Sequence, residues 1–133
     1  MEGDAVIVID TQTLVWWTGG SKKLSKRAES ALRRNREIVI PSICLWEYAM
    51  LSTRGRIRLK RSLQEALGEI LAQPDVVVHP ITVDIGIRAA GLSLGRPMDP
   101  ADQLVAATAL ELGVPLITSD LEIQALPGLD VIW

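Results

Sequence analysis

The sequence predicts an α/β domain built on a mainly parallel β-sheet that helices cover on both faces. Short apolar segments alternate with helical segments along the whole chain, which is the order expected of this fold class. The apolar segments are hydrophobic throughout, as strands buried on both faces are. No linker, repeat or low-complexity segment interrupts the 133 residues. One domain spanning residues 1–133 is therefore expected.

Four to five short strands are expected. Ala5–Ile9 is the first apolar run and ends at Asp10. Ile38–Ile40 is the second and stops at Pro41. Further strands are predicted at Val76–Val78 and Leu116–Thr118, and Val131–Trp133 would be the fifth.

Five helices are predicted from apolar residues at helical spacing and from the residues at the helix ends. Ser42 is expected to cap the second of them, which runs to about Ser52. The last begins at Asp99-Pro100 and closes at Gly113, the usual placement of proline and glycine at helix ends. The other three are expected at Ser21–Arg36, Lys60–Gln73 and Thr82–Leu94.

The scarcity of cysteine and histidine excludes several kinds of site. Cys44 and His79 are the single residues of their types, so neither an internal disulfide nor a thiolate zinc site is possible. Any metal must use oxygen ligands. The N-terminus lacks the basic region of a signal peptide, and no apolar run reaches the ~20 residues that span a bilayer. A cytoplasmic protein without membrane contact is expected.

Four carboxylates fall where parallel strands end. Asp10 directly follows the first strand, and Asp120 follows the fourth after one serine. Glu47 lies one turn into the helix after the second strand, and Asp102 lies in the first turn of the helix that begins at Asp99. Because ligands of open α/β sheets bind at the carboxyl ends of the strands, we expect these four groups to converge on one crevice.

Helix capping is the competing interpretation for three of them. Asp10 and Asp120 could each be an N-cap, and Asp99 with Asp102 resembles a capping box. Glu47 is different, because it is the only charged residue between Ile43 and Leu51. A lone carboxylate in an apolar segment indicates a cleft site or a buried ion pair.

Four carboxylates in one crevice would repel one another unless a cation were bound. Carboxylate oxygens are hard ligands that suit Mg²⁺ or Mn²⁺. Such a site is typical of phosphate-ester chemistry, so a nuclease or a phosphatase is favoured.

Four ordered blocks of the sequence resemble the PIN-domain ribonucleases, and more narrowly the VapC-type toxins of toxin–antitoxin pairs. The blocks are IDTQTLVWW, SICLWEYAM, DPADQLVAATALELGVPLITSD and the terminal VIW. The third is the most specific, because it joins a DP-x-D motif to a T-x-D motif.

The resemblance implies a three-layer α/β/α fold and an acidic site at Asp10, Glu47, Asp102 and Asp120. It also implies supporting hydroxyls at Thr11 and Thr118, and a recurrent position of less defined role at Ser42. The implied activity is a Mg²⁺-dependent endoribonuclease that leaves 5′-phosphate and 3′-hydroxyl ends, with tRNA or ribosomal RNA as the substrate. A small cognate antitoxin and a homodimer are the implied partners. Asp10 and Asp102 would be the principal metal ligands.

The chain departs from the subfamily at two positions. Gln12 stands where histidine is usual, and Gln103 stands where arginine is usual. Neither is one of the four acids, but the second removes a cation beside Asp102.

The net charge of −2 conceals a basic N-terminal half and an acidic C-terminal half. Solvated surface is the ordinary interpretation of charge runs. A basic surface beside a metal site would also hold RNA phosphates. The candidate RNA-binding residues are Lys22, Lys26, Arg33, Arg54, Arg56 and Arg58. The tryptophans Trp16, Trp17 and Trp46 are expected to pack in a core or an interface rather than to stack on bases.

Two alternatives to a toxin endoribonuclease remain open. One is a PIN nuclease that matures RNA or acts on DNA. The other is a PIN module that binds RNA or protein without cutting. The four acids argue against the second alternative, whereas Gln12 and Gln103 keep it open.

Overall fold

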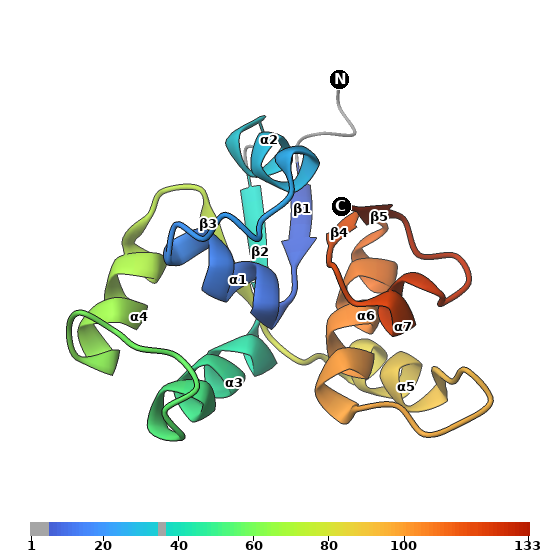
Figure 1. Ribbon diagram of the computed structural model, residues 1–133. Helices are drawn as coiled ribbons and strands as arrows, with labels where there is room; N and C mark the ends of the chain where they lie inside the picture. The colour runs from blue at the N-terminus through green and yellow to red at the C-terminus, as the bar shows by residue number, and fades with distance from the viewer. Residues whose placement is uncertain (1–5, 35–36) are drawn as a thin grey trace.

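The computed structural model describes residues 6–34 and 37–133, which form a five-stranded parallel sheet with helices around it (Figure 1). The strands are β1 (Val6–Ile9), β2 (Glu37–Pro41), β3 (Val76–His79), β4 (Leu116–Ile117) and β5 (Val131–Ile132). The helices are α1 (Thr11–Thr18), α2 (Lys26–Arg34), α3 (Ser42–Thr53), α4 (Leu63–Ala72), α5 (Val83–Gly91), α6 (Pro100–Leu112) and α7 (Leu121–Gln124).

The first strand of the chain is the centre of the sheet. The strand order is β3-β2-β1-β4-β5, so β1 pairs with β2 on one edge and with β4 on the other. The chain therefore runs from the central strand β1 through β2 to β3 at one edge of the sheet. It then crosses back to β4 on the other side of β1 and ends at β5 on the opposite edge. A reversal of this kind leaves a crevice at the carboxyl ends of the central strands.

Helices cover both faces of the sheet. Right-handed crossovers place the helices before β3 on one face and those after it on the other, because the direction of travel reverses between them. In Figure 1, α1 and α4 lie to the left of β1, and α5 and α6 lie to its right. The expected α/β fold with a parallel sheet is confirmed.

The core is aliphatic and is centred on the strands. Ile7, Val8 and Ile9 of β1 are at most 1% exposed, and the central residues of β2 and β4 are buried as well. A strand between two layers of helices has no face to solvent, which is why these segments carry no polar alternation. All five predicted strands are present; Ala5 lies outside the described residues.

The basic helix is shorter than predicted. The prediction was Ser21–Arg36, whereas α2 runs from Lys26 to Arg34. Its start is fixed by Ser25, whose hydroxyl accepts a hydrogen bond from the backbone N–H of Ala28 at 3.0 Å. Asn35 and Arg36 lie outside the described residues.

Two other helix starts also differ from the prediction. Ser42 is the first helical residue of α3 and not its cap; Pro41 occupies the cap position, and no side chain caps this helix. Helix α4 begins at Leu63 rather than at Lys60, because Ser62 and Glu65 form a capping box.

The start and end of α6 are as predicted. The carboxylate of Asp99 accepts a hydrogen bond from the N–H of Ala101 at 2.8 Å, and Pro100 takes the first helical position. Gly113 ends the helix at φ 67°, a left-handed conformation that side chains disfavour. None of the helices in the described part of the chain is both long and apolar enough to cross a membrane.

Candidate active site

The four predicted carboxylates come from four separate elements and meet at the carboxyl edge of the sheet. Asp10 follows β1 and Asp120 lies just beyond β4, while Glu47 belongs to α3 and Asp102 to the first turn of α6. Burial raises the pKa of Asp102, and the negative charges of the other three carboxylates raise it further. The convergence expected from the strand ends is therefore present in the structure.

Asp10 is the most buried of the four and is held by both of its oxygens. It is 6% exposed. Its Oδ1 accepts from the backbone N–H of Thr13 at 2.8 Å, and its Oδ2 accepts from the hydroxyl of Thr118 at 2.5 Å. Burial raises the pKa of Asp10, hydrogen bonds from Thr118 and Thr13 oppose this rise, and the charge of Asp120 adds to it.

Thr118 links the two aspartates that follow the strands. Its hydroxyl donates to Asp10 and accepts from the backbone N–H of Asp120 at 3.1 Å. Gln124 in turn donates to the carbonyl of Thr118 at 2.8 Å. Thr118 is fully buried, so this hydroxyl fixes the two acids relative to each other.

The capping interpretation of Asp10 and Asp120 is also correct. Asp10 caps α1 through Thr13. Asp120 caps α7, and its Oδ1 accepts from the N–H groups of Glu122 and Ile123 at 2.8 and 3.2 Å. Capping fixes these side chains at the edge of the sheet. The cap and the site residue are the same group here.

Glu47 has a hydroxyl for a partner. The side chain of Thr11 donates a hydrogen bond to Glu47 Oε1. Glu47 is half-buried, and burial raises its pKa; the Thr11 hydrogen bond opposes this, and the charges of Asp99 and Asp10 add to it. Its partner is therefore a hydroxyl and not the cation of a buried ion pair, and the predicted cleft site stays a prediction.

Asp102 carries the clearest sign of crowding. Its pKa is raised to about 7, first by burial and then by the charges of four other carboxylates. These are Asp99, Asp120, Glu47 and Asp10, in decreasing order of effect. Each of these charges is negative, so each of them raises the pKa of Asp102 further.

Two residues near the site carried no signal of that role in the sequence. Asp99 was expected to be a cap, which it is. Its charge also adds to the rise in pKa that burial causes at Asp102 and at Glu47. Cys44 is fully buried. Its thiol lies next to Thr11 beneath the carboxylates, and burial raises its pKa. The place of Glu47 was predicted from the strand ends, whereas the place of Cys44, one turn before it on α3, was not.

The residues that replace the usual histidine and arginine have different surroundings. Gln12 is exposed. Gln103 donates from its side-chain nitrogen to the carbonyl of Leu92 at 2.8 Å. The second glutamine therefore holds the end of α5 against the start of α6.

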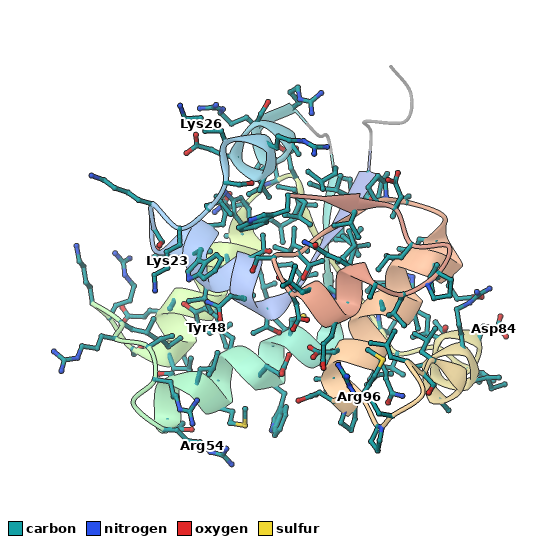
Figure 2. The ribbon with its side chains drawn as sticks, turned by 45° about the vertical axis from the view of Figure 1, so that its right-hand side comes forward. Lys23, Lys26, Tyr48, Arg54, Asp84 and Arg96 are labelled. Carbon is teal, nitrogen blue, oxygen red and sulfur yellow. The ribbon has the colours of Figure 1, made fainter. Side chains whose placement is uncertain are left out.

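The predicted RNA-binding residues are spread over the molecule. Lys22 and Arg33 line a cavity of about 450 Å³ with Trp16 and Trp17. Arg58 lines a second cavity of about 610 Å³ beside the same two tryptophans. Lys26 belongs to α2, which leads into the amino end of β2, and Figure 2 shows it at the opposite end of the molecule from Arg54. Arg54 directly follows α3, and Arg56 lies two residues beyond it.

The tryptophans differ in exposure. Trp16 packs on Trp133 with ring centroids 5.7 Å apart. Trp17 packs against the core. Trp46 is 58% exposed, so it does not pack in the core of this chain, and packing in an interface stays a prediction.

Comparison with protein families gives a match to the PIN domain over residues 7–129. This chain belongs to the PIN domain family. The family predicted from the four sequence blocks is thereby confirmed.

Known proteins similar to this PIN domain include ribonucleases and toxin complexes. Ribonuclease VapC22 of Mycobacterium tuberculosis is 29% identical over 119 residues, which are 90% of each chain. The structure resembles VapBC2 of Rickettsia felis, solved with a promoter DNA fragment, at a TM-score of 0.69 and 18% identity over 95% of this chain and 96% of that one. It also resembles M. tuberculosis VapC20, a sarcin-ricin loop cleaving toxin, at a TM-score of 0.67 and 18% identity over 90% and 93% of the chains.

The donor set of this PIN domain suits a divalent cation of the hard class. Five carboxylates lie close enough for their charges to affect one another's pKa values. Carboxylate oxygens are the ligands that Mg²⁺ and Mn²⁺ prefer. Within residues 6–34 and 37–133, no three acidic, histidine or cysteine side chains are grouped as the ligands of a single ion. A cation at this place would therefore be held in part through its own waters, which can bridge the ion to carboxylates that do not touch it.

Proposed function

We propose that this PIN domain is the toxin of a type II toxin–antitoxin pair and hydrolyses phosphodiester bonds of cellular RNA, in tRNA or ribosomal RNA. The observation that carries the proposal is the convergence of Asp10, Glu47, Asp102 and Asp120. Burial raises the pKa of Asp102 to about 7 together with the charges of Asp99 and of the other three acids. Buried carboxylates that repel one another cost stability, and a bound dication would remove that cost. The similarity to a ribonuclease over 90% of the chain supports RNA as the substrate.

The proposed cofactor is Mg²⁺, with Mn²⁺ as a substitute. Asp10 and Asp102 would be its principal ligands, and Asp120 and Glu47 would complete the site through water. When bound, such an ion lowers the pKa of a water and neutralises the leaving oxygen.

The protein's own groups perform the positioning. Thr118 fixes Asp10, and Thr11 fixes Glu47, so both carboxylates are oriented before substrate binds. Glu47 and Asp120 would orient the attacking water. Because Asp120 is also held by the N–H groups of α7, its orientation does not depend on the cation.

The proposed partners are a small antitoxin and a second copy of this chain, with the cytoplasm as the place of action. The similarity of this fold to solved toxin–antitoxin complexes supports an antitoxin as a partner. A nuclease that matures RNA or acts on DNA remains the alternative, and so does a PIN module that binds without cutting.

The test is RNA cleavage by three purified variants. Asp10→Asn and Asp102→Asn are expected to abolish Mg²⁺-dependent cleavage of total bacterial RNA while the circular dichroism spectrum stays that of a folded protein. Asp84→Asn is the matched control, because Asp84 also lies in the first turn of a helix but outside the acidic cluster. Undiminished cleavage by both site variants would refute the assignment.

Expression in a bacterial host separates a toxin from the alternatives. Wild-type protein is expected to arrest growth, and Asp102→Asn is expected to leave growth unaffected. Relief of the arrest by the neighbouring small gene product would identify the antitoxin. Cleavage in vitro without growth arrest would instead favour a maturation nuclease.

A further inference from the structure

The loop from Leu92 to Asp99 is held at both ends beside the acidic site. At its start, the carbonyl of Leu92 accepts the hydrogen bond from Gln103 of α6. At its end, Asp99 caps α6. Between them, Gly95 turns the chain at φ 81° and donates its N–H to the hydroxyl of Ser93 at 3.0 Å. The loop is therefore tied to α6 at both ends.

Arg96 extends from this loop toward α7. Its guanidinium forms an ion pair with Glu122, which lies two residues beyond Asp120 in the first turn of α7. Figure 2 shows Arg96 beside the start of α6. The pair thus places a cation beside the first turn of α7, the helix that Asp120 caps.

The Arg96–Glu122 ion pair contributes little to the free energy of unfolding. The two side chains are 63% and 50% exposed, and exposed pairs contribute about 0–1 kcal/mol. Its guanidinium has five N–H donors, and the contact with Glu122 engages one nitrogen. Donors remain for a second anion, and phosphate matches the fork of arginine.

A second arginine provides a comparison within the same half of the chain. Residues 67–133 contain only two cations, Arg88 and Arg96. Arg88 also pairs with a glutamate of a neighbouring helix, Glu111. Glu111 lies near the carboxyl end of α6, whereas Asp102 lies in its first turn. Two similar ion pairs therefore differ in their distance from the acidic site.

We infer that Arg96 binds an RNA phosphate next to the bond being cut. This inference rests on the proposed nuclease function. Gln103 contributes indirectly, because it anchors the loop that carries Arg96. The RNA strand would then lie across the starts of α6 and α7, with its phosphates between Arg96 and the four carboxylates.

Binding of a short, fluorescein-labelled oligouridylate tests the inference. Fluorescence anisotropy is measured over a salt series, with Ca²⁺ in place of Mg²⁺. Arg96→Ala is expected to weaken binding about tenfold and to reduce the slope of log affinity against log salt by about 0.7, the value for one phosphate contact on a single strand. Arg96→Lys is expected to fall between Arg96→Ala and the wild type, because lysine keeps the charge and loses the fork.

Arg88→Ala is the matched control, because it also removes one exposed arginine–glutamate pair. It is expected to bind as the wild type does. Equal affinities of Arg96→Ala and Arg88→Ala would overturn the inference. A weaker affinity of Arg96→Ala with an unchanged salt slope would overturn it as well, because that result indicates distortion rather than a lost phosphate contact.

The same experiment distinguishes failure of the inference from failure of the proposed function. If wild-type protein with Mg²⁺ cuts no RNA but binds the oligonucleotide through Arg96, the nuclease proposal fails and the inference stands. If the wild type cuts RNA and Arg96→Ala binds equally well, the inference alone fails.

Discussion

At the scale of single residues, hydroxyl groups organise the site as much as carboxylates do. Thr118 and Thr11 each donate to one acid, and Thr118 also accepts from the backbone of Asp120. A hydroxyl can do both at once because it carries a donor and two lone pairs. Threonine at these two positions therefore fixes acids that would otherwise turn away from one another.

Asp102 should make the stability of the metal-free protein depend on pH. Its pKa is about 7 in the folded state and 3.8 in a model peptide. Between these values the folded protein retains a proton that the unfolded chain has lost, so the free energy of unfolding falls as pH rises from 3.8 to about 7. Asp10 and Glu47 act in the same direction, because their pKa values are raised too.

The measurement is urea unfolding in EDTA across that pH range. Asp102→Asn is expected to flatten the decline relative to the wild type, and Asp84→Asn is expected to keep it. If Asp102→Asn declined as steeply as the wild type, crowding at Asp102 would not be the cause.

The four acids could be predicted from the sequence because each follows a strand or opens a helix, and strand ends are readable. The extra charge of Asp99 at the site could not, since capping alone explains an aspartate before proline. Nor could the exposure of Trp46, because an apolar helix segment does not reveal which of its faces meets solvent. The roles of the four acids, of Ser42 and of the basic residues stay predictions.

At the scale of elements, the site is assembled by the junctions of β1 with α1 and of β4 with α7. The hydroxyl of Thr13 donates to the carbonyl of Ile117 at 3.0 Å and so ties α1 to β4. Thr118 continues the same connection to Asp10. Two adjacent strands are thereby locked together at the edge where the acids lie.

Thr118→Val should weaken both the fold and the proposed activity. Valine has a similar shape but leaves Asp10 and the N–H of Asp120 without this partner, which should cost about 1–3 kcal/mol. Thr108→Val is the control, since Thr108 is also buried and its hydroxyl donates to Leu104 within α6. We expect urea unfolding to show a lower free energy of unfolding for both variants. RNA cleavage should slow for Thr118→Val alone. Full activity of Thr118→Val would show that Asp10 needs no such support.

Elements with clear periodicity or end signals were predictable, and α1 was not. Thr11-Gln12-Thr13 is polar, and Trp16-Trp17 breaks the helical spacing of apolar residues, so the segment shows no amphipathic pattern. It forms a helix because Asp10 caps it and because the core accepts Leu14. Helix α7 has four residues, too few to show any period. The start of α4 was readable in hindsight, from Ser62 and Glu65.

At the scale of the whole molecule, the basic residues form two clusters in different regions. The first cluster lies within residues 22–34 and the second within residues 54–61. Helix α2 leads into the amino end of β2, whereas residues 54–61 follow α3, the helix that carries Glu47. Figure 2 shows Lys26 and Arg54 at opposite ends of the view. The second cluster therefore has the better position to extend an RNA surface from the acidic site.

Charge reversal should distinguish the clusters. Arg56→Glu with Arg58→Glu is expected to weaken RNA binding strongly at low salt and less at high salt, because phosphate contacts release counterions. Lys26→Glu with Arg33→Glu has the same change of net charge and is expected to have the smaller effect. Filter binding of total RNA measures both. Equal losses would mean that only net charge matters.

The proposed homodimer would need an apolar surface, and the exposed aliphatic residues of α5 offer one. Val83 and Ile87, one turn apart, are 78% and 69% exposed. Val83→Asp with Ile87→Asp is expected to convert a homodimer to a monomer in light scattering after size-exclusion chromatography. Leu121→Asp, at an equally exposed position on α7, is the control and should remain a dimer. A double variant that stays dimeric would place the interface elsewhere.

The hydrogen bond between Thr118 and Asp10 joins residues 108 positions apart, and this has a consequence for synthesis. A ribosome adds about 5–20 residues per second, so several seconds pass between the two residues. The central strand β1 emerges first and waits for β4, its partner from the end of the chain. A nascent or truncated chain therefore lacks Thr118 and Asp120 and has no complete catalytic centre. The proposed toxin would be harmless to the ribosome that is making it until translation is almost finished.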